Sequence, residues 1–238
     1  MEIWKTIKKA VRKKVGLDMD YRVEVDCAGK EFLGTEYGGW CICPEKIAPG
    51  GVLYSLGVGE DISFDLAMIE RYKVSVFAFD PTPRSIGWVK GQALPENFRF
   101  YDFGITSYDG AAMFYPHPNP KHVSHTVLTR RKQGGSGIEV QFRRLKTVMD
   151  MLGHNRIDIL KMDIEGAEYE VLDDLLSSGI EIGQLLVEFH HEKRFREAGI
   201  LRTKKCIAEL QKRGFRIFYV SKSQEEFSFI KGPATDDR

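Results

Sequence analysis

The stretch "IDILKMDIEGAEYEVL", residues 157–172, contains an apolar, β-branched run that ends in a turn rich in acids. The run Ile157–Asp163 has the composition of a buried strand, and the apolar residues after Gly166 fall at helical spacing. The carboxylates of Asp163, Glu165 and Glu168 surround the turn. Glu165 and Glu168 also suit a helix start, where the dipole favours negative charge. We therefore expect a strand that delivers Asp163 to the edge of a sheet.

Similar short runs recur on both sides of this strand, with helical patterns between them, which indicates an α/β fold with a mostly parallel sheet. The predicted strands are Val52–Leu56, Val74–Phe79, Phe98–Phe103, Ile157–Asp163, Gln184–His190, Phe215–Val220 and Glu226–Lys231. Only Ser221–Glu225 separates the last two, which is too short for a parallel crossover. The sequence thus predicts a Rossmann-like, seven-stranded sheet in which five parallel strands are followed by an antiparallel C-terminal hairpin.

The first predicted strand runs into a glycine turn within "YSLGVGEDISFD". Gly57 and Gly59 allow close backbone approach, but the third glycine of a dinucleotide fingerprint is missing. Glu60 and Asp61 would repel a pyrophosphate at the helix start. S-adenosylmethionine carries an ammonium and a sulfonium but no phosphate, so it fits this turn better than NAD does. Asp61 is also placed to cap the following helix.

Two further strand ends suit the rest of such a nucleoside. Asp80 follows the second predicted strand at a spacing from Gly57 typical of an acid that accepts hydrogen bonds from ribose hydroxyls. An Asp before proline is also a common turn residue. After the third strand, Asp102, Gly104 and Ile105 offer one polar group and small or flat apolar surface for an adenine.

Candidate catalytic groups follow the fourth and fifth strands. Parallel strands bind ligands at their carboxyl ends, so Asp163 should share a crevice with Glu188 and His190 of "LLVEFHH". A carboxylate there would orient a hydroxyl, and a histidine with a pKa of about 6.5 would accept its proton. For His190, simple packing is an equally good interpretation.

The runs "ILKMDIEGAEYEVL", "LLVEFHH" and "YSLGVGEDISFD" together resemble the FkbM-type family of S-adenosylmethionine-dependent methyltransferases, over roughly residues 34–231. The resemblance implies a class I methyltransferase fold and methyl transfer to a hydroxyl oxygen of a sugar, glycan or natural product. It also implies that Gly57, Gly59 and Asp80 hold the cofactor and that Asp163 is the acid after the fourth strand. The chain departs from the common pattern at Ser55, where an acid is more usual, and Glu60 or Asp61 is expected to supply that charge.

Two other functions fit parts of the pattern: a nicotinamide-dependent enzyme on a related sheet, and a non-catalytic module that keeps the nucleoside pocket. A divalent metal is compatible with the carboxylates, although no dedicated ligand spacing is present. We expect residues 1–33 to form an amphipathic helix and an extended lead-in, and residues 34–238 to form the methyltransferase domain.

Two loops are candidates for acceptor binding. Tyr37 and Trp40 flank a glycine pair and are placed either to stack on a ring or to pack as a lid over the cofactor. A long segment, residues 115–137, contains His122 and His125 before a basic cluster, and segments of this length tend to be functional or disordered. The histidines lack the spacing of a zinc site.

Composition sets the remaining expectations. The chain has 238 residues with 35 basic and 34 acidic side chains, and its net charge of +1 argues against nucleic acid as a partner. Residues 2–15 form a basic amphipathic pattern that suits weak association with a membrane surface, or a helix packed on the domain. The four cysteines form no CxxC pair and no signal peptide is evident, so we expect a reduced, cytoplasmic protein.

Overall fold

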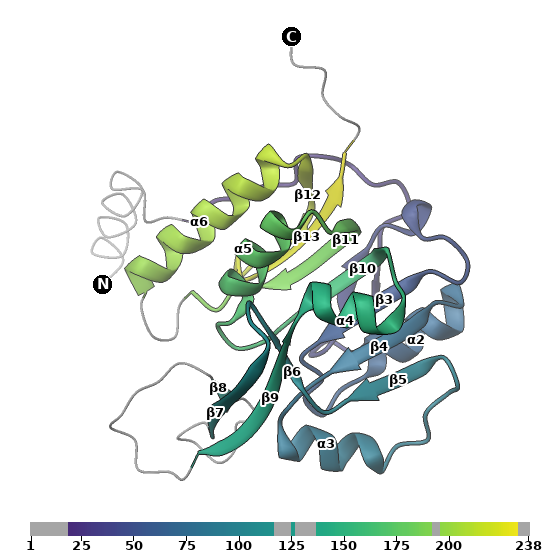
Figure 1. Ribbon diagram of the computed structural model, residues 1–238. Coiled ribbons are helices and arrows are strands. Elements are labelled where there is room, and N and C mark those ends of the chain that lie inside the picture. Colours follow the sequence, from purple (N-terminus) through teal and green to yellow (C-terminus); the bar gives the residue numbers. More distant parts are fainter. Residues whose placement is uncertain (1–18, 117–124, 127–136, 192–195, 233–238) are drawn as a thin grey trace, which may run out of the picture.

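The computed structural model describes residues 19–116, 125–126, 137–191 and 196–232. Its central element is the predicted seven-stranded sheet (Figure 1). From one edge to the other the strands are β12 (Phe215–Val220), β13 (Glu226–Lys231), β11 (Glu181–Glu188), β10 (Arg156–Met162), β3 (Val52–Leu56), β4 (Ser75–Phe79) and β5 (Phe98–Tyr101). The residues expected to form strands therefore do so, with ends that differ by a few residues.

The five strands from β11 to β5 are parallel, while β13 runs antiparallel to both β11 and β12. The chain builds from β3 outward through β4 and β5, then returns to the other side of β3 with β10 and β11. The order of the strands therefore reverses between β3 and β10. In open α/β sheets, ligands bind outside the carboxyl ends of the strands at such a reversal.

Helices cover both faces of the sheet (Figure 1). One face packs against α4 (Leu145–Leu152), α5 (Glu168–Ser178) and α6 (Arg196–Lys212), and the other against α2 (Ser63–Tyr72) and α3 (Pro83–Lys90). Successive strand residues alternate between the two apolar cores, so Tyr54 and Leu56 face the first and Leu53 the second. Burial on both faces explains why these strands read as nearly continuous apolar runs.

A second sheet was not anticipated from the sequence. It has the order β6 (Gly104–Thr106), β9 (Ile138–Arg144), β7 (Gly110–Pro116) and β8 (His125–Thr126), with β7 and β9 antiparallel. β7 and β9 lie at the two ends of the segment 115–137 that was expected to be a loop, and β8 lies within it. The rest of that segment lies mostly outside the described residues. Asp109 accepts hydrogen bonds from the Arg144 backbone N–H (2.9 Å) and the Thr147 hydroxyl (2.8 Å), which joins the turn before β7 to the start of α4.

The lead-in from Met19 to Leu33 packs against the domain. Backbone groups of Tyr21 exchange hydrogen bonds with the Gln224 side chain, and Glu24 accepts one from the Ile217 N–H (2.8 Å). The boundary expected after Leu33 falls inside a hairpin of β1 (Glu31–Leu33) and β2 (Trp40–Ile42), which precedes the short helix η1 (Pro44–Lys46). The amphipathic segment 2–15 lies outside the described residues.

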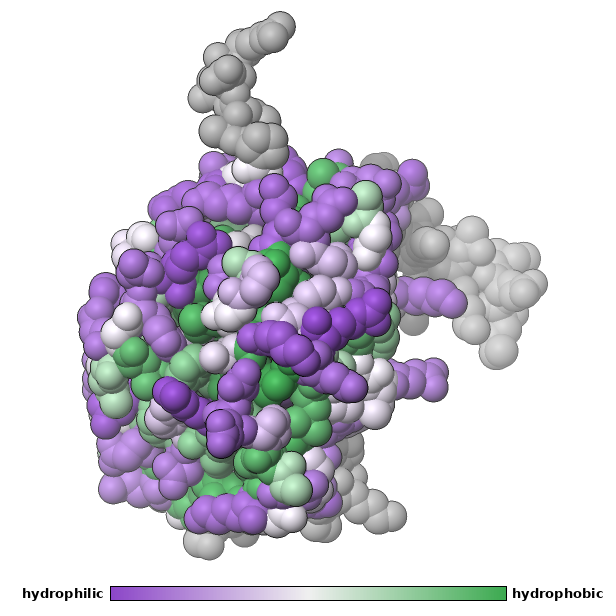
Figure 2. Space-filling view, turned by 90° about the vertical axis from the view of Figure 1, so that its right-hand side faces the viewer, coloured by the Kyte–Doolittle hydropathy of each residue, from purple (hydrophilic) through white to green (hydrophobic). Residues whose placement is uncertain are grey.

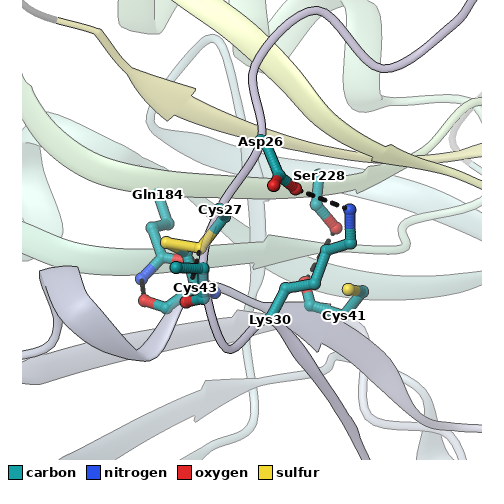
Figure 3. Close-up of a disulfide and its surroundings, with 8 residues drawn as sticks. Asp26, Cys27, Lys30, Cys41, Cys43, Gln184 and Ser228 are labelled. Carbon is teal, nitrogen blue, oxygen red and sulfur yellow. Dashed lines mark hydrogen bonds and ion pairs between the residues drawn. A yellow bond between two sulfur atoms is a disulfide. The ribbon is translucent and has the colours of Figure 1, made fainter.

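The structure corrects the expectation of fully reduced cysteines, because Cys27 forms a disulfide with Cys43 (Figure 3). The pair lies over the sheet, where the Gln184 side chain bonds both the N–H (2.8 Å) and the carbonyl (2.9 Å) of Cys43. Cys41 and Cys206 are buried free thiols. Spacing in sequence gave no sign of this disulfide, since its partners come together only through the turn that joins β1 and β2.

Hydrophilic residues cover much of the face in Figure 2, and apolar residues show between them. Large apolar side chains with substantial exposure in the described ranges include Phe32, Met151 and Leu201. None of the described helices has the length and apolar character required to cross a membrane.

We expect Cys27→Ser to lower the free energy of unfolding by about 3 kcal/mol, because the disulfide closes a loop of 16 residues in the unfolded chain. Urea unfolding with and without reductant measures this change. The wild-type chain should lose stability when reductant is added, whereas Cys27→Ser should not respond. A wild-type midpoint that reductant leaves unchanged would contradict the disulfide.

Candidate active site

A cleft of about 970 Å³ opens at the carboxyl ends of β3, β4, β10 and β11, at the reversal of strand order. This volume lies within the range of small-molecule and cofactor sites. Most of the predicted site residues line it: Tyr37, Trp40, Gly57, Gly59, Glu60, Asp61, Asp80, Gly104, Ile105, Asp163, Glu188 and His190. Asp102 is exposed and is not among the lining residues, so its predicted position beside an adenine is not supported.

The glycine turn is shaped by the meeting of two strands. Gly57 has a φ of 80°, and a Cβ placed there would overlap the carbonyl oxygen of Asp163 at the end of β10. The Asp163 N–H donates to the Leu56 carbonyl (2.9 Å), so the two strand ends remain paired up to the turn. Gly59 also has a positive φ of 59°, but open space surrounds its Cβ position. A glycine is therefore required at position 57, because the end of β10 packs against it, whereas the space beside Gly59 is open.

Asp80 fixes the shape of this turn. One carboxylate oxygen accepts hydrogen bonds from the N–H groups of Val58 (2.9 Å) and Gly59 (3.0 Å), and the other accepts one from Thr82 (2.8 Å). The side chain is buried, at 5% exposure. Asp80 thus orients the backbone at the predicted cofactor site. A carboxylate has further lone pairs, so a ribose hydroxyl can still be accepted.

The two acids of the turn already have partners. Glu60 pairs with Arg84 at 2.5 Å. Asp61 accepts hydrogen bonds from the Ser63 N–H (2.7 Å) and the Thr35 hydroxyl (2.5 Å). Burial raises the pKa of Asp61, but these hydrogen bonds outweigh it and lower the pKa below its ordinary value. Asp61 therefore stays ionised beside the cleft. The N-cap of α2 is Ile62 and not Asp61 as expected, although Asp61 accepts the hydrogen bond of the first helical N–H, that of Ser63.

The bond from Thr35 to Asp61 ties the segment between β1 and β2 to the glycine turn. Within that segment Tyr37 is 92% exposed at the rim of the cleft, while Trp40 is 6% exposed and belongs to the apolar core. Burial thus favours packing for Trp40 over stacking on an acceptor. Elsewhere in the cleft, the Phe142 ring packs directly against Gly104, where a Cβ would overlap the ring.

Two buried charged residues near the glycine turn, Lys161 and Asp65, were missed in the sequence. Lys161, 7% exposed in β10, donates a hydrogen bond to the Gly57 carbonyl. Asp65 of α2 is 2% exposed, and burial raises its pKa to about 6 although the charge of Lys161 opposes the shift. Ser55, where an acid is more usual, is also buried and lies in register with Lys161. The signal that could have revealed Lys161 was a lysine inside an otherwise apolar strand.

His190 lies at the centre of the predicted catalytic group. Its Nδ1 is 2.7 Å from Oε1 of Glu168, which is fully buried and also accepts hydrogen bonds from the N–H groups of Ile164 and Gly166. Glu168 therefore does more than favour a helix start. The second ring nitrogen, Nε2, lies 3.6–3.7 Å from carboxylate oxygens of Asp163, Glu165 and Glu188.

This arrangement changes the protonation of the cluster. Burial alone lowers the pKa of His190. The hydrogen bond to Glu168 and the negative charges of Glu168, Asp163 and Glu165 outweigh burial and raise the pKa to about 10. The expected histidine with an ordinary pKa is therefore wrong. Burial and the charge of Asp163 raise the pKa of Glu188 to about 8, and burial raises that of Asp163. Glu165 has a φ of 54°, which is unusual for a residue with a side chain and recurs at functional sites.

The cleft as a whole is strongly acidic. Lys161, Arg84 and His190 are its basic side chains among the described residues. The acids that line it are Glu36, Glu60, Asp61, Asp80, Asp163, Glu165, Glu170, Glu188 and Glu226. His122 lies outside the described residues, and for His125 only the backbone of β8 is described, so their predicted role at the acceptor stays a prediction.

The strand order, the reversed hairpin and the cleft beside a glycine turn define a class I methyltransferase. The model of the "Methyltransferase FkbM domain" matches residues 44–217. The chain therefore belongs to the FkbM family of S-adenosylmethionine-dependent methyltransferases, and the nicotinamide-dependent alternative is not supported.

Relatives agree with this assignment. "Probable methyltransferase-like protein 24" of Rattus norvegicus is 30% identical over 179 residues, which are 71% of this chain and 43% of that protein. The protein of the same name from Homo sapiens is 30% identical over 176 residues, 70% of this chain and 42% of the relative. The chain thus spans about two-fifths of the length of the curated relatives it matches.

Solved structures are more distant. Fibrillarin from Methanococcus jannaschii is 12% identical with a TM-score of 0.43, covering 88% of this chain and 86% of that one. Aeropyrum pernix fibrillarin, solved with bound S-adenosyl-L-methionine, is 10% identical with a TM-score of 0.40, covering 87% and 84%. At this distance the likeness carries no argument about function.

The two glycines of the turn should respond differently to alanine. Gly57→Ala should lower the free energy of unfolding by about 3 kcal/mol or more, because a backbone clash adds to the left-handed conformation. Gly59→Ala should lose only about 1–2 kcal/mol, because its surroundings are open. Chemical unfolding of both variants makes the comparison. Equal losses would show that Asp163 does not approach Gly57 as described.

Asp65 should make stability depend on pH. Its folded pKa of about 6 exceeds the ordinary 3.8, so the stability it contributes is complete below pH 3.8 and is lost as the pH rises through about 6. The difference between the folded and the ordinary pKa of Asp65 corresponds to a change of about 3 kcal/mol in the free energy of unfolding. Asp65→Asn should remove this slope in unfolding free energy between about pH 4 and pH 6. A variant that keeps the wild-type slope would place the titrating group elsewhere.

Proposed function

We propose that this chain transfers a methyl group from S-adenosylmethionine to a hydroxyl oxygen of a neutral acceptor, such as a sugar, glycan or natural product. The observation that carries the proposal is the pair Asp163 and Glu188. They lie at the ends of neighbouring parallel strands, β10 and β11, and both line the cleft beside the glycine turn.

The residues present fit the cofactor. Open space at Gly59 and the turn held by Asp80 give the backbone close access to a nucleoside. The ionised Asp61 suits a cationic ligand, whereas a pyrophosphate would meet an acidic wall. Gly104 and Ile105 line the far end, where an adenine requires small or apolar neighbours. When bound, the cofactor supplies a methyl group already activated by its sulfonium.

The protein must therefore align an oxygen, exclude water and accept the hydroxyl proton. Asp163 and Glu188 are 37% and 25% exposed, so both carboxylates are accessible from the cleft. His190 is only 8% exposed and is held by Glu168. We assign His190 the role of positioning the two carboxylates, one of which orients the hydroxyl while the other accepts its proton.

The charge of the cleft supports a neutral acceptor. Nucleic acid carries a phosphate at every step, and these phosphates would meet a cleft lined by nine acidic and three basic side chains. A sugar or natural product with free hydroxyls meets no such repulsion. Tyr37, at the rim, provides an exposed aromatic ring against which such an acceptor can stack.

Incubation of the chain with methyl-deuterated cofactor and a cell extract tests the proposal. Mass spectrometry should detect a small molecule or glycan that has gained a deuterated methyl group on oxygen. Label found on nucleic acid, or on nitrogen, would contradict the acceptor class. Cofactor binding without label on any component would indicate the non-catalytic module instead.

Asp163→Asn and Glu188→Gln should each lower kcat at least about tenfold, equivalent to about 1.4 kcal/mol of barrier, because each removes a group that orients the hydroxyl or accepts its proton. Cofactor affinity should fall less than the rate. Glu181→Gln, at the other end of β11 and 64% exposed on its side chain, is the matched control and should keep wild-type rates. Full turnover of Asp163→Asn at saturating cofactor would make Asp163 a cofactor ligand.

A further inference from the structure

The face of His190 that points away from Glu168 has an unusual environment. Nε2 belongs to a side chain that is 8% exposed, yet none of the described residues lies within hydrogen-bonding distance of it. Instead it is directed at Oδ1 of Asp163 (3.7 Å), Oε2 of Glu165 (3.6 Å) and Oε1 of Glu188 (3.7 Å). Nε2 of this largely buried side chain thus lies just beyond hydrogen-bonding distance of three carboxylates.

These separations are a few tenths of an ångström longer than those between atoms that share a metal ion. Two ligand atoms that each lie about 2.1 Å from one ion are about 3.0 Å apart at a right angle and about 3.4 Å apart at a tetrahedral angle. Ligand atoms of Asp163, Glu165 and His190 all lie within 4.8 Å of one another. A small inward movement would bring all three to an ion placed between them.

The far side of the imidazole is built as metal-binding histidines usually are. Such a histidine commonly donates its second ring N–H to a carboxylate, which fixes the tautomer and directs the lone pair of the other nitrogen at the ion. Glu168 provides this partner at Nδ1, and the Ile164 and Gly166 N–H groups hold Glu168 in turn. The orientation of Nε2 is therefore set by buried groups outside the cluster.

We propose that Asp163, Glu165 and His190 bind one divalent cation. Two carboxylates and one imidazole suit an ion of intermediate hardness such as Mn²⁺. The absence of a cysteine among these ligands disfavours a structural zinc site. Binding of the ion would displace the proton from Nε2 of His190, because a metal-bound imidazole nitrogen must be deprotonated. Glu188, whose Oε1 is 3.7 Å from Nε2, would remain available to the acceptor.

The role of the ion rests on the proposed function. A hydroxyl next to it would have a lowered pKa, and its proton would pass to the Glu188 carboxylate. The new C–O bond forms as the C–S bond of the cofactor breaks, leaving a neutral thioether and a methyl ether. Charges balance, since the sulfonium charge is lost with the charge of the carboxylate.

Titration of the chelator-treated full chain with Mn²⁺, followed by electron paramagnetic resonance of the free ion, tests the site directly. We expect one ion per chain, and at least about tenfold weaker binding in Glu165→Gln and in His190→Ala. Glu165 is 34% exposed and on the cleft side, so Glu165→Gln should keep the fold even if His190→Ala does not. The matched control Glu170→Gln, an acid on the same cleft wall outside the cluster, should bind as the wild type does.

No binding at millimolar Mn²⁺, or equal affinity in Glu165→Gln and Glu170→Gln, would overturn the site. Methyl-transfer assays on the same samples separate this inference from the proposed function. Turnover by wild-type chain that binds no metal would refute the site and leave the function standing. One bound ion that is lost in Glu165→Gln supports the site even if no hydroxyl acceptor is methylated.

Discussion

The site depends on the close approach between Gly57 and the carbonyl of Asp163, where β3 and β10 end side by side. No side chain fits between them, so the glycine turn and the acid after β10 must lie next to each other. Lys161 donates a hydrogen bond to the Gly57 carbonyl. Asp80 accepts hydrogen bonds from the next two N–H groups, those of Val58 and Gly59. One steric constraint thus places the cofactor turn within reach of the catalytic carboxylates.

Charge is the second organising feature. Acidic side chains line most of the cleft, and two buried cations lie among them. These are Lys161 next to the glycine turn and His190 next to Asp163, Glu165 and Glu188. Removing a group that faces one of these buried cations leaves its charge uncompensated, so the neighbours of Lys161 and His190 are expected to be sensitive to substitution. The same excess of negative charge favours a cationic cofactor, a neutral acceptor and a divalent ion.

The sequence predicted the main sheet well, because buried parallel strands read as apolar runs and the link from Ser221 to Glu225 permits only a hairpin. It also identified the strand ends that line the cleft, since parallel strands bring those ends to one edge. It did not predict contacts set by tertiary packing: the buried Glu168, the disulfide of Cys27 and Cys43, and the second sheet. For His190 the residue was found, but its pKa depends on burial and on three acidic neighbours, Glu168, Asp163 and Glu165, whose positions only the fold specifies.

Calorimetric titration of the chain with S-adenosylmethionine and, separately, with NAD most directly tests the claim that the cleft is built for a cationic nucleoside. We expect saturable binding of one S-adenosylmethionine per chain and no binding of NAD at the same concentrations. Binding of NAD with comparable affinity, or no binding of S-adenosylmethionine, would contradict it.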